Sequence, residues 1–291
     1  MGLTRGEKVF NAANIAFFVV LMLVMIYPFW YMIMGSLSES DRTAAGGLFL
    51  VPQGFSLSAY KAVFQNVSIL SGFKVTVITT VCGTAIGTFF SATTAYAISR
   101  RRLRGGTFFS MLILFTMLFS GGMIPTYLLV KSLHMIDTYW ALILPGSIGA
   151  WNIFVMVGFF RNLPDELEEA AKIDGANDLV VFFSVVLPLS KPVLATVGLF
   201  IAVGYWNDFF SSVLYATEKN MWQLQMVLKD LISNTSAAIS QAGISVAVQQ
   251  DINPFTMKLA SILVSSLPIL AVYPFLQKHF VKGAMIGSVK G

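Results

Sequence analysis

The 291-residue sequence has few charged residues and almost no cysteine, and both shortages restrict its class. Cys82 is the only cysteine, so no disulfide can form within the chain and a disulfide-stapled secreted domain is excluded. Only 11% of residues are charged, whereas soluble domains average about 25%. A disordered chain would be poor in large apolar residues, but this sequence has 25 phenylalanines and is 56% hydrophobic. The composition therefore predicts a membrane protein.

Patterns typical of catalysis and metal binding are also missing. No glycine is followed directly by lysine, so the sequence lacks the phosphate-binding loop of ATPases, and we expect no ATP hydrolysis by this chain. It has neither an H-E-x-x-H zinc motif nor a G-x-S-x-G nucleophile motif. The two histidines, His134 and His279, and the one cysteine argue against a Cys/His metal site. We expect no enzyme activity and no metal or cofactor bound by this chain.

Six apolar runs are long enough to cross a bilayer, whose core needs about 20 helical residues. We place them at 15–34, 75–98, 108–130, 139–160, 192–215 and 255–276. The second run contains Gly83 and Gly87, a spacing of small residues that lets another helix approach closely. The third is interrupted by Gly121, Gly122 and Pro125. The first run is longer than the apolar core of a signal peptide, about 7–15 residues, so we expect a retained helix.

The basic residues predict how these helices are oriented, because Lys and Arg in short loops stay on the cytoplasmic side. A cytoplasmic N-terminus puts 12 of the 19 Lys and Arg residues inside, including the cluster 100–104. No aromatic-interleaved basic face accompanies this cluster, so we expect no nucleic-acid partner. The sequence thus predicts an all-α integral membrane protein with six transmembrane helices and both termini cytoplasmic. The predicted parts are an N-terminal segment 1–14, a transmembrane domain 15–277 with external loops 37–74 and 216–254 and a cytoplasmic loop 161–190, and a tail 278–291.

The cytoplasmic loop 161–190 is the most acidic stretch of the chain. Pro164 suits the first turn of a helix, and the acids that follow complement the positive N-terminal dipole. Gly175 is placed to end this helix in the left-handed conformation, and Asn177 or Asp178 then caps a second helix that runs to Pro188. The prediction is a helix-turn-helix at the cytoplasmic surface, between the fourth and fifth spans.

This loop closely resembles the coupling motif in the permease subunits of binding-protein-dependent ABC importers. The family pattern is E-A-A, three residues, Gly, nine residues and I-x-L-P; the chain has Glu169-Ala170-Ala171, Gly175 and 185–188, with Val185 replacing Ile. The resemblance implies that the loop docks in a cleft of an ATPase subunit, with Glu169 paired to a basic residue there. The alternative is an amphipathic helix at the membrane surface with a solvated acidic face.

The resemblance narrows to carbohydrate importers of the maltose-transporter type. The C-terminal segment 281–291 resembles their tail, which implies contact of Gly287, Val289, Lys290 and Gly291 with the ATPase subunits. The segments 27–29 and 36–38 resemble the branch that takes oligosaccharides from lipoprotein-type binding proteins.

The fifth and fourth runs contain candidate residues of a substrate path. Trp206, Asn207 and Asp208 are similar to a segment of those permeases, and Trp151 with Asn152 repeats the pairing of an indole with an amide. An indole packs on the apolar face of a sugar, and an amide both donates to and accepts from its hydroxyls. Asp208 is the acid most clearly inside a predicted span, where it needs a cavity or a partner. Alternatively, the polar pair hydrogen-bonds to backbone, Trp206 simply packs, and the other permease subunit holds the substrate.

The resemblance as a whole implies a permease subunit of an ATP-driven oligosaccharide importer in the bacterial cytoplasmic (inner) membrane. Its implied partners are a second, different permease subunit, two cytoplasmic ATP-binding subunits that hold ATP and Mg, and an extracytoplasmic solute-binding protein. The alternatives are an importer of another solute, such as amino acids or peptides, and a stand-alone secondary transporter. The last would use several midplane carboxylates and an internal repeat, and we find Asp208 alone and no clear repeat.

Overall fold

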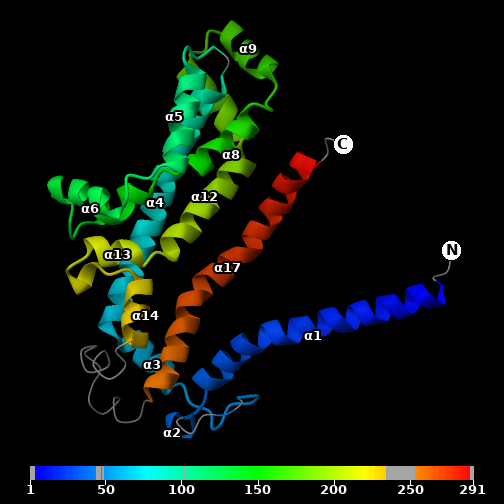
Figure 1. Ribbon diagram of the computed structural model, residues 1–291, viewed down its shortest axis with the longest axis vertical. Coiled ribbons are helices and arrows are strands. Elements are labelled where there is room, and N and C mark those ends of the chain that lie inside the picture. Colours follow the sequence, from blue (N-terminus) through cyan, green and yellow to red (C-terminus); the bar gives the residue numbers. More distant parts are fainter. Residues whose placement is uncertain (1–3, 44–46, 48, 101, 234–252, 289–291) are drawn as a thin grey trace. The chain divides into compact units, whose positions relative to one another are not determined.

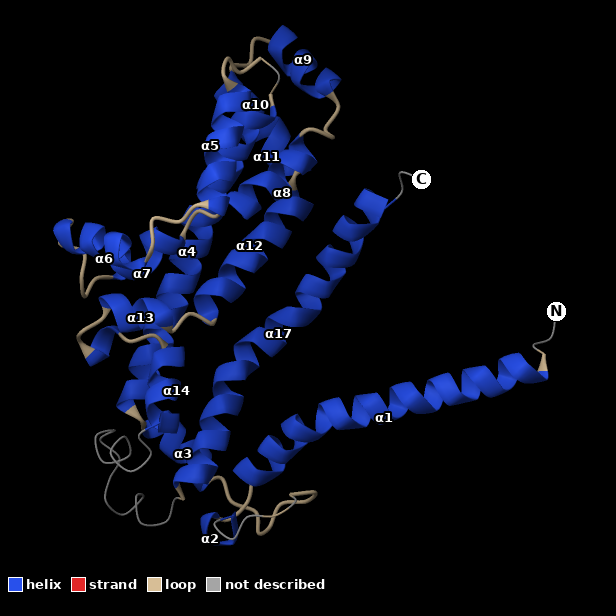
Figure 2. Ribbon diagram, in the orientation of Figure 1, coloured by secondary structure: helices blue, strands red, loops and turns tan. Residues whose placement is uncertain are grey.

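The computed structural model describes residues 4–43, 47, 49–100, 102–233 and 253–288, without the side chains of 40, 41 and 273–288. Every regular element in these ranges is a helix, and the one β contact is an isolated bridge between Ser38 and Phe55 (Figure 2). The prediction of an all-α chain is therefore confirmed. The chain divides into two compact units, 1–70 with 228–267 and 71–227 with 268–291, and each is described by itself.

The first unit holds the N-terminal helix α1 (Arg5–Ser36), α2 (Ser40–Thr43) and α3 (Ser58–Gln65). A capping box begins α1: the Thr4 hydroxyl accepts from the Glu7 N–H, and the Glu7 carboxylate accepts from the Thr4 N–H. The apolar side chains along α1 are exposed, as expected for a helix that faces lipid.

The second unit is built on four helices that lie side by side in Figure 1. They are α4 (Val67–Ser99), α5 (Gly106–Leu118), α8 (Ala150–Phe160) and α12 (Lys191–Trp206). Their core is one cluster of buried apolar residues, among them Ala92, Tyr96, Phe160, Phe182 and Ile201. The cluster joins the end of α4 to α8, α12 and the segment that precedes α12, so these elements share one packed interior.

Close packing along α4 depends on the two glycines predicted to admit a neighbouring helix. A Cβ at Gly83 would lie 2.3 Å from the ring of Tyr205 on α12, and a Cβ at Gly87 would lie 2.3 Å from the backbone oxygen of Ser147. No real side chain tolerates such distances, so the prediction of a close approach at these glycines is confirmed.

Three described helices are long and apolar enough to span a membrane alone: α1, α4 and the first part of α17 (Pro254–Ser288). Three helix pairs satisfy the same test only together, and each is sharply bent. They are α5 with α6 (Met123–Ser132) at 110°, α7 (Tyr139–Ile143) and η1 (Leu144–Gly146) with α8 at 53°, and 178–189 with α12 at 82°. The sequence predicted the break in the first pair, which falls at 119–122, where Gly122 has a φ of +91°. It also separated a helix running to Pro188 from the fifth run 192–215, but it did not predict the break in the second pair.

The fifth apolar run differs from its prediction, because it is not one continuous helix. Helix α12 ends at Trp206 and α13 (Phe210–Tyr215) begins after a short break. The Asn207 amide donates to the Val203 carbonyl at 3.0 Å, and Asp208 Oδ1 accepts from the Ser211 N–H at 3.1 Å. These short polar side chains offer the backbone an alternative to the helical ladder. Asp208 thus lies at a break, not inside a span as predicted.

The segments predicted as loops contain helices of their own. Beside α3 they include η3 (Lys219–Met221) and α14 (Leu224–Ser233). Buried hydroxyls attach the start of α14 to two helices. The Leu224 N–H donates to Thr76 Oγ1 of α4 at 2.8 Å, and the Gln223 N–H donates to Ser212 Oγ of α13 at 2.9 Å. The predicted loop 216–254 also includes 234–252, which lie outside the described residues.

Candidate functional site

The acidic segment forms the predicted helix-turn-helix. Helix α9 (Asp165–Ile173) has Pro164 at its N-cap and three acids in its first turn. It ends at Ile173, and Gly175, just past its C-cap Asp174, has a φ of +83°, a conformation that glycine adopts without steric cost. The Gly175 N–H donates to the Lys172 carbonyl and the Ala176 N–H to the Ala171 carbonyl, each at 2.9 Å. These bonds satisfy the carbonyls at the helix end and reverse the chain.

The second helix of this element begins where one of the two predicted caps stands. Asn177 Oδ1 accepts from the Val180 N–H at 2.9 Å, so Asn177 is the N-cap of α10 (Asp178–Val181). The helix continues through the π-helical turn η2 (Phe182–Val186) to α11 (Leu187–Leu189), past Pro188. Val186 is buried, and Leu187 packs against the core cluster. The apolar half of the motif therefore anchors the element to the second unit.

The Glu-Ala-Ala residues present a small polar and apolar surface. Glu169 and Ala170 are exposed, and Ala171 is half-buried against the core cluster. Glu169 makes no ion pair with any residue that the structure describes. In Figure 1 the helix α9 stands beyond the ends of α5 and α8 within this unit. Its Glu169 carboxylate is therefore accessible to another protein.

The preceding acid, Glu168, is buried, which the sequence did not predict. Its Oε1 lies 2.8 Å from Nη2 of Arg100, the residue that follows α4, and the two side chains are 11% and 10% exposed. Glu168 and Glu169 are adjacent acids whose side chains point about 100° apart on the helix. The sequence does not show which of these two directions faces the protein interior, so it does not distinguish the buried glutamate from the exposed one. For Arg100 the sequence indicates only a place in the basic cluster that orients the helices in the membrane.

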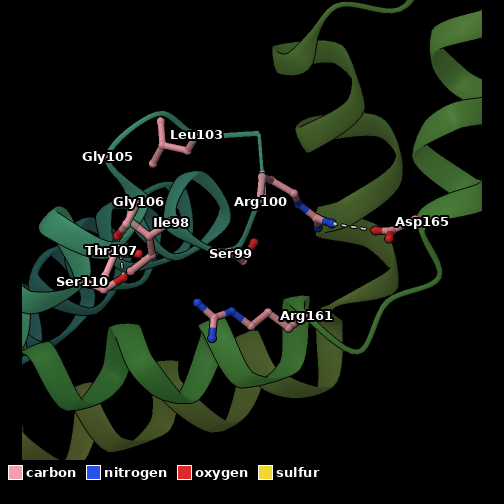
Figure 3. Close-up of a pocket in the computed structure, with 10 residues that line it drawn as sticks. All are labelled: Ile98, Ser99, Arg100, Leu103, Gly105, Gly106, Thr107, Ser110, Arg161 and Asp165. Carbon is pink, nitrogen blue, oxygen red and sulfur yellow. Dashed lines mark hydrogen bonds and ion pairs between the residues drawn. The ribbon is translucent and has the colours of Figure 1, made fainter.

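Arg100 also borders a hollow of about 600 Å³ at the end of α4 and the start of α5. Figure 3 shows Arg100 reaching toward Asp165 of α9, with Arg161, the C-cap of α8, on the opposite side of the hollow. The Asp165 carboxylate is 3.8 Å from Arg100 Nη1 and is 83% exposed, so this contact is weak.

Two of the five predicted substrate-path residues line one pocket. Asn152 of α8 and Asp208, which follows α12, border a cavity of about 350 Å³. The rest of the lining is small or apolar: Gly146, Gly149, Phe200, Ile201, Gly204 and Tyr205. An amide and a carboxylate in such a wall suit hydroxyl recognition, because together they offer both donors and acceptors.

The other three predicted substrate-path residues do not line this pocket. Trp151 is 50% exposed and lies edge-on to Phe200, which does border the pocket, with ring centres 5.4 Å apart. Trp206 is 8% exposed and packs edge-on against Phe73 at 5.8 Å, and Asn207 bonds to backbone as described above.

The predicted tail residues divide between the described and undescribed parts of the chain. Gly287 lies in α17, which continues past the predicted end of the sixth span at residue 276. Val289, Lys290 and Gly291 lie outside the described residues. Among the residues that are described, no group of three or more His, Cys, Asp or Glu side chains gathers to hold a metal ion.

Comparison with known proteins decides the family of the chain. Residues 87–285 match the family of binding-protein-dependent transport system inner membrane components. The chain belongs to this family. The match includes the helix-turn-helix of α9 to α11 and both pocket residues, and it confirms the resemblance inferred from the Glu169–Gly175 motif. A family member is a transport permease in the inner membrane, so this chain is a permease subunit and not an enzyme.

Individual relatives agree over nearly the whole chain. Protein LplC of Bacillus subtilis is 47% identical over 291 residues, which cover 99% of this chain and 97% of LplC. The polygalacturonan/rhamnogalacturonan transport system permease protein YtcP of the same organism is 43% identical over 288 residues, 98% of this chain and 99% of YtcP. A chain in the crystal structure of a bacterial ABC transporter involved in import of the acidic polysaccharide alginate has a TM-score of 0.90 and 32% identity, covering 96% of this chain and 99% of that one.

Proposed function

We propose that this permease is one of two different transmembrane subunits of an ATP-driven importer of oligosaccharides. An extracytoplasmic binding protein delivers the sugar, and two cytoplasmic ATP-binding subunits hold ATP and Mg. The observation that carries the proposal is Glu169, which is exposed, makes no ion pair with a described residue, and stands on a capped helix at one end of the second unit. YtcP and the alginate transporter are both named for the transport of a polysaccharide, which supports a carbohydrate as the substrate.

In this mechanism the coupling element receives the movement of the ATPase subunits. Glu169 pairs with a basic residue in the ATPase cleft, and Gly175 holds the turn that presents it. ATP binds the closed ATPase pair better than the open pair, and only that difference in affinity can shift the permease between its outward- and inward-facing states. The tail residues 287–291 contribute a second contact with the ATPase subunits. Deleting them is expected to lower sugar-stimulated ATP hydrolysis without changing membrane insertion, which the apolar spans determine.

The membrane topology belongs to the same proposal. Six spans are proposed: α1, α4, α5 with α6, α7 and η1 with α8, α12 with α13, and the first part of α17. Residues 178–189 belong to the cytoplasmic loop 161–190; the segments 1–14 and 278–291 are also cytoplasmic, and the loops 37–74 and 216–254 lie outside. The test uses Lys61→Cys and Arg104→Cys, both at exposed positions, in a Cys82→Ser background. A membrane-impermeant thiol reagent added to intact cells is expected to label the first and not the second. Labelling of Arg104→Cys from outside contradicts the topology.

The pocket bordered by Asn152 and Asp208 is proposed as part of the sugar path, with Trp151, Trp206 and Asn207 beside it. Asp208→Asn removes the charge but keeps an oxygen that can cap α13, so the fold is retained. Asn152→Ala and Asp208→Asn are both expected to raise the sugar concentration needed for half-maximal uptake. Unchanged uptake in both variants assigns the substrate contacts to the other permease subunit.

The function itself is tested with the assembled transporter. We expect the ATPase subunits to co-purify with the detergent-solubilised permease pair, because α9 offers them a docking surface. Uptake by proteoliposomes is then measured with neutral oligosaccharides, acidic oligosaccharides, amino acids and peptides, each with the binding protein present. Uptake of oligosaccharides alone supports the proposal. Uptake of amino acids or peptides in their place, or uptake without any ATPase subunit, refutes it.

A further inference from the structure

The ion pair between Arg100 and Glu168 joins two elements with different roles. Glu168 belongs to α9, the helix that carries Glu169, and Arg100 is the first residue after α4. Both side chains are nearly nine-tenths buried, and Nη2 and Oε1 are 2.8 Å apart. The guanidinium also lies over the ring of Tyr96 on α4, 4.8 Å from its centre. Arg100 is therefore held to α4 by its contact with the Tyr96 ring and to α9 by its attraction to Glu168.

Burial makes this pair hard to separate. The two atoms lack the alignment of a hydrogen bond, so their attraction is chiefly coulombic. Removing one partner of a buried pair strands a charge away from water, and this penalty far exceeds the loss of an exposed pair. A second pair, Arg102 with Asp178 of α10, provides the contrast, because its side chains are 43% and 63% exposed. Water can solvate those two charges when they part, so that pair holds the elements together only weakly.

Helix α4 leads from this pair to the pocket. From Tyr96 it runs back past Gly87, which touches the Ser147 backbone, and Gly83, which touches Tyr205. Tyr205 and the residue before Ser147, Gly146, both line the pocket with Asp208. Because these contacts have no slack for even a Cβ, a displacement of α4 must displace the pocket walls.

We propose that the Arg100–Glu168 pair is the joint that makes α9 and α4 move as one body, so that displacement of the coupling helix reaches the pocket through α4. Both residues are positioning residues: neither contacts the ATPase in the proposed function nor lines the pocket. The inference rests on the proposed function, since it assumes that α9 docks the ATPase subunits.

The test uses the complete transporter in proteoliposomes and measures the number of sugar molecules imported per ATP hydrolysed. Glu168→Gln and Arg100→Gln are each expected to retain the bound ATPase subunits, because Glu169 and Gly175 are untouched, and to lower the ratio about tenfold. The double variant Arg100→Gln with Glu168→Gln strands no charge, so it recovers stability, but it still lacks the joint and keeps the low ratio. Asp178→Asn is the matched control and is expected to stay within about twofold of wild type.

A covalent joint provides the complementary measurement. Arg100→Cys and Glu168→Cys are combined with Cys82→Ser and bridged by a short bifunctional thiol reagent, which is expected to restore a ratio lost in the unbridged protein. A wild-type ratio in the double Gln variant overturns the inference, and so does bridging that fails to restore the ratio. If the wild-type permease pair does not bind the ATPase subunits, the proposed function is refuted instead. The failure of the inference and the failure of the proposed function are therefore distinguishable.

Discussion

The coupling end and the pocket end of the second unit hold their polar groups in different ways. At the coupling end, charged side chains carry the contacts between elements: Arg100 with Glu168, and Arg102 with Asp178. Around the pocket, helices meet through glycines and neutral groups, such as the Tyr205 hydroxyl that donates to the Ile143 carbonyl at 2.5 Å. Water solvates the exposed pair of Arg102 with Asp178, and the buried charges of Arg100 and Glu168 compensate each other, whereas an unpaired charge in apolar surroundings is penalised. Charge changes should therefore dominate at the coupling end and volume changes near the pocket.

The largest effect is expected from Glu169→Lys. The substitution places a positive charge against the basic residue expected on the ATPase, and disrupting one member of an interfacial charge pair costs about 2–5 kcal/mol. Sugar uptake should be abolished and the ATPase subunits lost from pull-downs of the permease pair. Glu166→Lys on the same helix, also at an exposed position, is the matched control. Normal pull-down and uptake with Glu169→Lys would mean that α9 is not the coupling element.

Gly87→Val tests the expectation that changes of side-chain volume have the larger effect near the pocket. A Cβ there lies 2.3 Å from a backbone oxygen, which cannot rotate away, so Gly87→Val forces α4 from the Ser147 segment. Overpacking of this kind costs about 1–3 kcal/mol, which should lower the Tm of the purified transporter and reduce uptake. Gly204→Val is the control for stability, since a Cβ at Gly204 meets nothing within 4 Å. An equal Tm for the two variants contradicts the close approach.

The sequence predicted the coupling end more completely than the pocket end, and the reason is physical. Pro164, Gly175 and Asn177 act on backbone within a few residues of themselves, so their spacing predicts both helices and the turn. The breaks near Gly149 and Asn207 lie inside apolar runs whose hydropathy is the same for a straight or a bent helix. Their geometry depends on which distant elements pack there. The Arg100–Glu168 contact joins residues 68 positions apart and leaves no local pattern.

A backbone effect at the coupling end is expected to be smaller than the charge effect. Gly175→Ala adds a Cβ that meets no neighbour, so its penalty comes only from the positive φ, about 1–2 kcal/mol for an L-residue. Weaker ATPase binding and reduced uptake should follow, with insertion unchanged. Gly175→Asn tests whether the positive φ is the cause of the loss, because asparagine tolerates this conformation better than alanine. Uptake should therefore rank wild type, Asn, then Ala, and an Ala variant that equals or exceeds the Asn variant contradicts this explanation.

The smallest effect tests a charged contact away from the coupling end. Asp137 lies in the segment between α6 and α7 and accepts hydrogen bonds from the Thr217 hydroxyl, the Glu218 N–H and the Thr217 N–H. These bonds, that of the Thr217 hydroxyl above all, hold the pKa of its carboxyl below the ordinary 3.8. A carboxyl whose pKa is lower in the folded state stabilises the fold above the unfolded pKa, and this contribution is lost as the pH falls through the folded pKa. Asp137→Asn should lower the Tm at neutral pH by the equivalent of less than about 1 kcal/mol, because the site is exposed to solvent that weakens charged contacts. The Tm difference between the two proteins should shrink as the pH falls from about 3.8 through the lowered pKa of the folded carboxyl, because the wild-type side chain then also becomes neutral. A Tm difference that stays constant down to lower pH would mean that the hydrogen bonds of Asp137, and not its charge, stabilise this segment. The contrast between the coupling end and the pocket end would then rest on the burial of their polar groups alone.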